Sequence, residues 1–589
     1  MSTLQTVLDS IGFDVRPQQL ALYRQLLGCD ETGVVVQAGT GTGKSLAVLT
    51  AAVDWNRRTG KMSLVVVPMN TLLDQYLTLD APRVAAATGA RIESLKGRNR
   101  YLCESANGFD TIARPPQWVM DELPAMQQAL VEDEIFEPQN TTWFGCPGSE
   151  ECDPEKVCHY RIQKERAQAA DVVVTNSHLL IIDNQIKRAQ EPEVDEDGER
   201  KEPPILIFPP IGVVLVDEAH VLEDSLREFA TRSLSSGACQ GYLLGYWIDD
   251  RAVKLSEPTA VPGDADLAAA LAEMADVVAD WPKERGKIPK RIREASEAAA
   301  YILNRAKNKA YSTGSAVLYI SPAERYTNQQ NKLVSTQIDM SLAAAGLLTS
   351  QPFGMVSATI PKTLRKSLGI ETATFLDVGH PFDYAKQARL GISAHSGAWK
   401  ATKSNPANMR ERAEEIRAQV EAVGGGALLL FPSYRDLEFV YKQIAGPLHL
   451  AGYRVLKQER DGNKALLGAQ FKTDGNAVLF GTESFATGFD VPGNALRLVS
   501  IWKLPYAGLD PLTRAISERD YGRYQDMMLV KVAQAAGRLI RTKDDVGEVW
   551  IADSRARGAI LGTGDPMLST FDEMDLLIAE RPVDMVEMN

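Results

Sequence analysis

The chain has 589 residues and a net charge of −13, so it is too long for one hydrophobic core and we expect three or four domains. Its 44% hydrophobic and 24% charged residues are typical of a water-soluble globular protein. No run approaches the roughly 18 apolar residues of a membrane span, and the first residues lack the pattern of a signal peptide. With six cysteines, which fit a reducing compartment, we expect a cytoplasmic protein without a membrane partner. Its acidity excludes general binding to polyanions but leaves room for a local basic channel.

The first predicted element with a chemical signature is the stretch VVVQAGTGTGKSLAVL at 34–49. Its valines indicate a buried strand of a parallel sheet, and the apolar run after Ser45 indicates a helix. In such a loop backbone N–H groups bind phosphate oxygens, Lys44 reaches the β- and γ-phosphates, and the Ser45 hydroxyl ligates Mg²⁺. Ala38 stands where this motif has its first glycine, and an ordinary glycine-rich turn is the alternative. The predicted nucleoside triphosphate site comprises Gly39, Thr40, Gly41, Thr42, Gly43, Lys44 and Ser45.

Four of the six cysteines lie in one region, separated by 42, 5 and 5 residues. They are Cys103, Cys146, Cys152 and Cys158. Zinc usually takes cysteines separated by about two to four residues, whereas wider gaps can reach around a [4Fe–4S] cluster, which needs one thiolate per iron. The spacing therefore leaves a zinc site and an iron–sulfur cluster open. Cys29 and Cys239 are isolated, which is typical of small buried hydrophobic residues.

A second strand with a chemical signature is IGVVLV at 211–216, which runs directly into Asp-Glu-Ala-His at 217–220. Acidic residues at the end of an apolar strand suit the metal side of a nucleotide site. Asp217 would hold Mg²⁺, and Glu218 would orient and deprotonate the attacking water. A strand followed by a helix that Asp217 caps is the alternative. Because a phosphate loop precedes this strand, the sequence favours the catalytic interpretation.

Near the C-terminus, QAAGRLIR at 534–541 contains two arginines three residues apart. On a helix, Arg538 and Arg541 would share one face. Arginine supplied from a second domain neutralises charge on a phosphoryl group during its transfer. An exposed basic helix end is the alternative. Because the arginines lie about 490 residues beyond Lys44, we expect a second domain to close on the first when ATP binds.

Taken together, these segments resemble superfamily 2 helicases, and more specifically the XPD/DinG family. The resemblance follows the family order over most of the chain. Its segments are RPQQ (16–19), the phosphate loop, VVVPMNTLLDQY (65–76), SLKGRNRYLC (94–103), ADVVVTNSHLL (170–180), DEAH (217–220), VSAT (356–359), GHPFDY (379–384), LLLFPSY (428–434), GTESFATGFDVPG (481–493), KLPY (503–506) and QAAGRLIR (534–541). One departure is Arg100, which stands where the family signature has an asparagine before the tyrosine.

The resemblance implies further site residues, cofactors and partners. Gln19 would read the adenine of ATP, and Gln534 would join Arg538 and Arg541 in the catalytic set. The four cysteines would hold a structural [4Fe–4S] cluster, beside ATP and Mg²⁺. The implied partners are single-stranded DNA and forked duplex DNA, with a DNA–RNA hybrid as a further substrate. The implied polarity is 5′→3′, and we expect a monomer.

The predicted fold class is α/β, with two RecA-like doubly wound motor domains and two insertions in the first. The first motor is expected in three parts, at 1–98, 166–235 and 346–395, and the second at 396–589. Residues 99–165 would form the iron–sulfur insertion. Ala-rich runs between 236 and 345 predict amphipathic helices, which would form an arch-like insertion.

The leading hypothesis is an ATP-dependent DNA helicase that tracks along single-stranded DNA. A translocase or remodeller with the same motor, which displaces protein or RNA and unwinds duplex poorly, is one alternative. A nucleotide-gated binding module with slow hydrolysis is another. The set Lys44, Asp217, Glu218, Arg538 and Arg541 favours a motor, since a binding module would not need all five.

Overall fold

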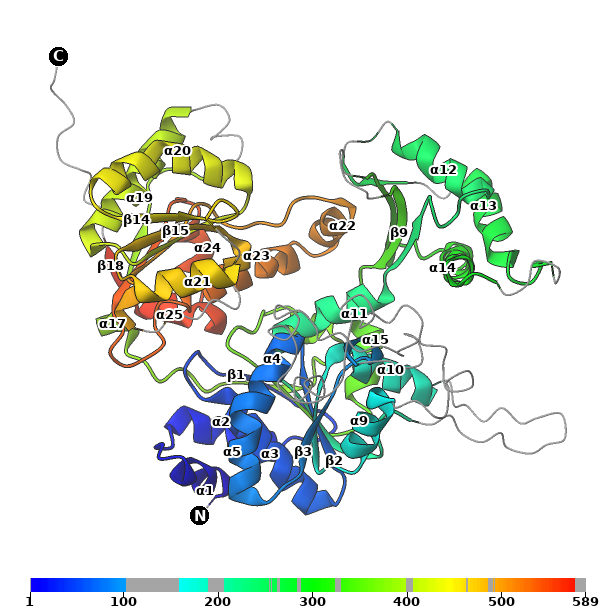
Figure 1. Cartoon of the computed structure of the whole chain (residues 1–589), viewed down its shortest axis with the longest axis horizontal. Helices are drawn as coiled ribbons and strands as arrows, with labels where there is room; N and C mark the ends of the chain where they lie inside the picture. Colours follow the sequence, from blue (N-terminus) through cyan, green and yellow to red (C-terminus); the bar gives the residue numbers. More distant parts are fainter. Residues whose placement is uncertain are drawn as a thin grey trace, which may run out of the picture.

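The computed structural model describes residues 2–101, 158–188, 206–253, 255, 257–261, 265–282, 288–323, 330–398, 406–461, 464–485, 491 and 493–577. The described chain forms two large α/β domains and one smaller domain (Figure 1). We call them the first domain, the second domain and the small domain. In Figure 1 the first domain lies below, the second at the upper left and the small domain at the upper right.

The first domain is built on seven parallel strands in the order β11-β1-β10-β5-β2-β4-β3. They are β1 Val34–Gln37, β2 Met62–Val67, β3 Ile92–Leu95, β4 Val172–Asn176, β5 Ile211–Val216, β10 Phe353–Ser357 and β11 Thr374–Asp377. β1, β2 and β10 are buried along their whole length. Continuous apolar runs of this kind arise because helices cover both faces of a parallel sheet.

Two hydrophobic cores sandwich this sheet, since successive side chains of a strand point to opposite faces. Val34, Val36 and Val65 belong to one core and Val35 and Val66 to the other. The first core includes helices α1 Thr3–Ser10, α2 Pro17–Leu27, α3 Lys44–Thr59, α4 Asn70–Gln75 and α5 Ala81–Thr88. The second includes α9 His159–Gln168, α10 Ser177–Arg188, α11 Leu222–Ala230, α15 Ser341–Leu348 and α16 Leu364–Ser367.

The second domain repeats this plan with seven parallel strands in the order β14-β15-β13-β16-β17-β12-β18. They are β12 Ala388–Ile392, β13 Ala427–Phe431, β14 Arg454–Lys457, β15 Ala477–Thr482, β16 Leu498–Ile501, β17 Gly547–Ile551 and β18 Asp575–Leu577. Its helices are α17 Tyr384–Gln387, α19 Pro406–Val423, α20 Tyr434–Leu450, α21 Lys464–Thr473, α22 Pro511–Arg519, α23 Tyr521–Ala536, α24 Ala556–Ile560 and α25 Ser569–Glu573. The expected boundary at 395/396 falls after β12, so it lies one strand too late. Long-range pairing with β17 and β18 decides this strand's sheet, and local pattern does not reveal it.

The small domain contains a four-stranded antiparallel sheet in the order β6-β9-β8-β7. Its elements are β6 Arg232–Ser235, α12 Leu243–Ala252, β7 Thr259–Ala260, α13 Ala265–Asp276, α14 Lys290–Lys307, β8 Ala316–Ser321 and β9 Lys332–Gln337. The Ala-rich runs form helices α13 and α14 as expected, but the helical arch-like insertion expected at 236–345 does not account for this sheet. β6 has four residues and begins before 236, and α15 packs in a core of the first domain.

Helices α22 and α23 tie the second domain to the other two (Figure 1). Arg519 donates to the Gly314 carbonyl and to the Asp339 carboxylate, both at 3.0 Å. The Arg523 guanidinium pairs with Glu223 on α11, and both side chains are only 12% exposed. The pair of helices therefore fixes how the second domain faces the first. Among the described helices, none is both long enough and apolar enough to span a membrane.

Candidate active site

The phosphate loop lies between β1 and α3, where its glycines are required by their surroundings. Gly41 and Gly43 have φ of +75° and +79°, in the left-handed region that favours glycine. A Cβ on Gly39 would lie 2.6 Å from the His380 Cβ, and one on Gly41 would lie 2.3 Å from the Phe382 ring. The loop is therefore bare because the segment 379–384 packs directly against it. Backbone N–H groups in such a loop can bind phosphate oxygens.

Lys44 and Gln19 both contact the backbone of this loop. The Lys44 ammonium donates to the carbonyls of Ala38 and Gly39, at 3.2 and 3.4 Å. The Gln19 amide, which is buried, donates to the Gly43 carbonyl at 3.1 Å. Both predicted nucleotide-binding side chains thus lie at the loop, at opposite ends of it.

Asp217 and Glu218 follow β5 at the same edge of the sheet as the loop. The buried Asp217 carboxylate accepts the Tyr76 hydroxyl at 2.7 Å and the Glu218 N–H at 2.8 Å. It does not cap α11, which begins only at Leu222. Glu218 has φ of +49°, an uncommon conformation for a residue other than glycine and one that clusters at functional sites.

The two carboxylates differ in their electrostatic environment. Burial, and then the Glu218 charge, raise the pKa of Asp217, and the Lys44 ammonium opposes that rise. Burial acts upward on Glu218 as well, but the groups around it, among them the Lys44 ammonium and the Ser357 hydroxyl, outweigh it and hold the pKa of Glu218 below its usual value. Glu218 therefore stays ionised and able to accept a proton.

The residues at this edge fit a nucleotide with Mg²⁺. The Ser45 hydroxyl and the Asp217 carboxylate are hard oxygen donors, which Mg²⁺ prefers. A carboxylate has about four lone-pair positions, and Asp217 uses two of them for Tyr76 and the Glu218 N–H. Acceptor capacity therefore remains for a cation.

A chain of hydrogen bonds joins Glu218 to the second domain. The Gln534 amide nitrogen lies 2.6 Å from His220 Nε2, and His220 Nδ1 lies 2.8 Å from Ser357 Oγ. The Ser357 hydroxyl donates to Glu218 Oε2 at 3.3 Å. Because the amide nitrogen donates, the neutral ring accepts at Nε2 and donates from Nδ1. Burial lowers the pKa of His220, which favours that neutral ring.

The stretch after α23 faces the phosphate loop. A Cβ on Gly537 would lie 3.4 Å from Thr40 Cγ2. The charge of Arg538 is among the groups that lower the pKa of Glu218. Burial raises the pKa of Tyr384, and the nearby Arg541 opposes that rise. The expectation that both arginines share a helix face is wrong, because α23 ends at Ala536 and Gly537 follows as its C-cap.

Comparison with known proteins agrees with this geometry. Residues 16–109 match the family model of the DEAD/DEAH box helicase, and residues 416–563 match that of the helicase C-terminal domain. The chain is 27% identical to the ATP-dependent DNA helicase YoaA of Escherichia coli (strain K12), over 92% of each protein. It is also 27% identical to the ATP-dependent helicase DinG of Mycobacterium tuberculosis (strain ATCC 25618 / H37Rv), over 95% of this chain and 93% of that protein.

A solved XPD helicase has the same fold, with a TM-score of 0.57 at 17% identity, over 92% of this chain and 96% of that one. The chain is an XPD/DinG-like superfamily 2 helicase. The resemblance found in the sequence is thus confirmed at the level of the family. As an enzyme, the helicase belongs to the ATP-dependent DEAD/DEAH class.

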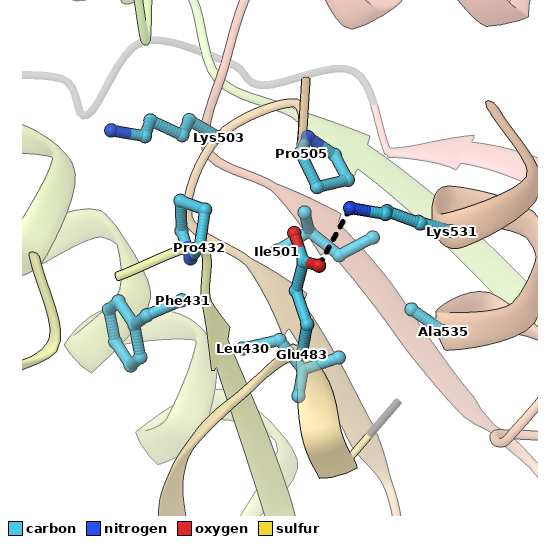
Figure 2. Close-up of a pocket in the computed structure, with 9 residues that line it drawn as sticks. All are labelled: Leu430, Phe431, Pro432, Glu483, Ile501, Lys503, Pro505, Lys531 and Ala535. Atoms are coloured by element: carbon cyan, nitrogen blue, oxygen red, sulfur yellow. Dashed lines mark hydrogen bonds and ion pairs between the residues drawn. The ribbon is translucent and has the colours of Figure 1, made fainter. Parts of the chain in front are cut away.

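In this helicase an ion pair holds α23, which carries Gln534, on the second sheet. The Lys531 ammonium lies 2.8 Å from the Glu483 carboxylate, just beyond the end of β15 (Figure 2). Around this pair lies a hollow lined by Leu430, Phe431, Pro432, Glu483, Ile501, Lys503, Pro505, Lys531 and Ala535. Its cavity volume is about 20 Å³, far below the roughly 300 Å³ of a small-molecule site. The hollow is therefore too small to hold a nucleotide.

The cysteines of the helicase divide into two kinds. Burial raises the pKa of Cys29 to about 12 and that of Cys239 to about 11, so both stay neutral thiols. Cys158 is half-buried and is the N-cap residue of α9. Cys103, Cys146 and Cys152 lie outside the described residues. Within the described ranges no group of three or more histidines, cysteines or acids could hold a metal ion.

Both flanks of the cysteine region meet in the first domain. Tyr101 and Tyr160 pack edge to face, with their ring centroids 5.6 Å apart. Tyr101 is buried in a core of the first domain, and Tyr160 packs against that core. These two aromatic side chains thus belong to the domain core, and Trp143 and Phe144 lie outside the described residues.

Sequence reasoning missed several residues that the structure brings to the site. Tyr76, Ser357, His380 and Phe382 all lie in segments that carried the resemblance, but no role followed from their spacing. Asp80 lies just beyond such a segment; burial raises the pKa of its carboxylate, and the Ser45 hydroxyl opposes that rise. Only Ser357 has a position that sequence reasoning could have used, because it ends a buried strand and ligands bind at the carboxyl ends of parallel strands.

Proposed function

We propose that this helicase couples ATP hydrolysis to movement along single-stranded DNA and parts forked duplex DNA or a DNA–RNA hybrid. The observation that carries the proposal is the hydrogen-bond chain from Glu218 through Ser357 and His220 to Gln534. It makes the group that acts on water sensitive to the position of the second domain. A motor needs that coupling, whereas a passive nucleotide-binding module does not.

In the proposed reaction the Glu218 carboxylate takes a proton from the attacking water. The water oxygen forms a bond to the γ-phosphorus, the bond to the β–γ bridging oxygen breaks, and ADP and phosphate leave. Lys44 and the loop N–H groups hold the phosphates. Gln19, at the opposite end of the loop, recognises the adenine of ATP. Bound Mg²⁺, held by Ser45 and Asp217, would supply positive charge to the phosphate oxygens.

The arginines of the second domain complete this site only when the two domains are closed. Arg538 lies close enough to influence Glu218, and Arg541 lies near the segment that covers the loop. Their charge would stabilise the transferred phosphoryl group. After phosphate leaves, that attraction is lost and the domains can separate, which converts hydrolysis into a step along the strand.

Further parts of the proposal concern the polarity, the cluster and the setting. We assign 5′→3′ movement, a [4Fe–4S] cluster on Cys103, Cys146, Cys152 and Cys158, and a monomer acting in the cytoplasm. The names of the relatives support DNA as the substrate. The buried thiols of Cys29 and Cys239 and the helix-end position of Cys158 support the choice of cysteines.

Strand displacement on duplexes with a 5′ or a 3′ single-stranded tail tests the proposal directly. We expect ATP-dependent displacement on the 5′-tailed duplex and none by the Glu218→Gln variant. Displacement of the 3′-tailed duplex alone would reverse the polarity. Strong DNA-stimulated hydrolysis without any displacement would identify a translocase that removes protein or RNA.

A further inference from the structure

A short π-helical segment, Tyr76–Asp80, lies between α4 and α5 beside the proposed Mg²⁺ ligands. π-Helical turns are rare and occur frequently at functional sites. The segment contacts α3, which begins at Lys44 and Ser45. It therefore lies beside the helix that directly follows the phosphate loop.

The first residue of this segment, Tyr76, contacts Asp217. Its side chain is only 1% exposed, and its hydroxyl donates to Asp217 Oδ2 at 2.7 Å. The hydroxyl is the donor in this contact, because an ionised carboxylate only accepts hydrogen bonds. With the Glu218 N–H on the other oxygen, the Asp217 carboxylate is held at two points.

The segment is anchored on both sides. On α4, Asp74 accepts from the Lys96 ammonium at 2.5 Å, and the Lys96 side chain is only 5% exposed. On α5, Arg83 lies 3.8 Å from Asp80. These contacts, together with the buried ring of Tyr76, fix the turn relative to the first sheet.

We propose that Tyr76 is a positioning residue that aims Asp217 at the Mg²⁺ of the bound nucleotide. The inference rests on the proposed function, since it takes Asp217 as a metal ligand. Residues that orient metal ligands typically contribute about 10- to 100-fold to metal affinity. Removing the Tyr76 hydroxyl should therefore weaken Mg²⁺ binding without removing the ligand itself.

The test titrates Mg²⁺ into the full-length helicase in the presence of a non-hydrolysable ATP analogue. The measured quantity is binding of the analogue, so the test does not depend on turnover. Tyr76→Phe removes one hydroxyl, and we expect the Mg²⁺ concentration at half-saturation to rise about 10-fold or more. Mn²⁺ bound to the nucleotide complex, counted by electron paramagnetic resonance, gives a second readout.

A matched control is available in the same domain. Tyr23 is also buried, and its hydroxyl also donates to a carboxylate, that of Asp54, remote from the proposed ligands. Tyr23→Phe should leave the Mg²⁺ titration unchanged. An equal shift in Tyr23→Phe and Tyr76→Phe, or no shift in Tyr76→Phe, would overturn the inference. If the wild-type protein itself bound the analogue without any dependence on Mg²⁺, the proposed metal ligands would fail instead.

Discussion

Replacing Gln534 by alanine tests whether the hydrogen bond between Gln534 and His220 couples the two domains. The substitution removes the amide that donates to His220 Nε2 across the domain interface. The His220 side chain is only 9% exposed, so no solvent would readily replace the lost partner while the domains are closed. The free-energy cost of an unpartnered His220 Nε2 therefore destabilises the closed arrangement alone, because opening the interface would let water bind the ring.

The magnitude follows from the cost of a buried polar atom without a partner, about 1–3 kcal/mol. Since about 1.4 kcal/mol is a factor of ten in an equilibrium, the closed arrangement should lose roughly 5- to 150-fold in population relative to the open one. Hydrolysis needs the closed arrangement, so the DNA-stimulated kcat should fall by a factor in that range. ATP binding to the first domain should change little, since Gln534 does not touch the phosphate loop.

The assay is steady-state ATP hydrolysis with saturating single-stranded DNA, alongside equilibrium binding of a fluorescent ATP analogue. Gln525→Ala is the matched control, because Gln525 is the same residue type on the same helix and is half-buried. It should keep kcat within about twofold of the wild type. A wild-type kcat in Gln534→Ala, or an equal loss in both variants, would refute the reasoning.

Three further predictions address the catalytic groups and the cysteines. Glu218→Gln should bind ATP but not hydrolyse it, whereas Lys44→Ala should weaken binding itself; normal turnover in Glu218→Gln would place the base elsewhere. Arg538→Ala and Arg541→Ala should each abolish DNA-stimulated hydrolysis while ATP still binds, and near-normal turnover in both would exclude a role across the interface. Protein purified without oxygen should carry about four irons per chain, and iron should fall on serine substitution at Cys103, Cys146, Cys152 or Cys158. Serine at Cys29 or Cys239 should leave it unchanged, and about one zinc per chain would replace the cluster assignment.

The parts of the site that could be predicted are those with a local physical cause. The glycines before Lys44 are needed wherever a backbone must wrap a phosphate, and acids after the strand 211–216 are needed wherever a metal sits at a sheet edge. These demands leave fixed spacings in the sequence. The helix end after Gln534 is also marked locally, by Gly537, because glycine disfavours a helix interior, whereas the spacing of the two arginines predicts a helix that continues.

The parts that could not be predicted depend on contacts between distant residues. Tyr76 meets Asp217 across 141 positions, and Gln534 meets His220 across 314. In both pairs, the sequence around one residue gives no indication of which residue it contacts. The antiparallel sheet of the small domain was missed for the same reason, because β6 and its partner β9 lie about 100 residues apart and Ala-rich helices dominate the sequence between them.

The segment between the two large sheets has a consequence for any attempt to cut the helicase in two. Phe382 and Tyr384 belong to the hydrophobic core of the second domain, yet the Phe382 ring and His380 also cover the phosphate loop of the first. A fragment that ends before Gly379 would leave the loop glycines uncovered, and the other fragment would carry the Phe382 ring without the loop that it packs against. A single proteolytic cut at 379–384 should therefore abolish ATP hydrolysis even where both halves stay folded. The reason is that this segment packs in the core of the second domain and also covers the phosphate loop of the first.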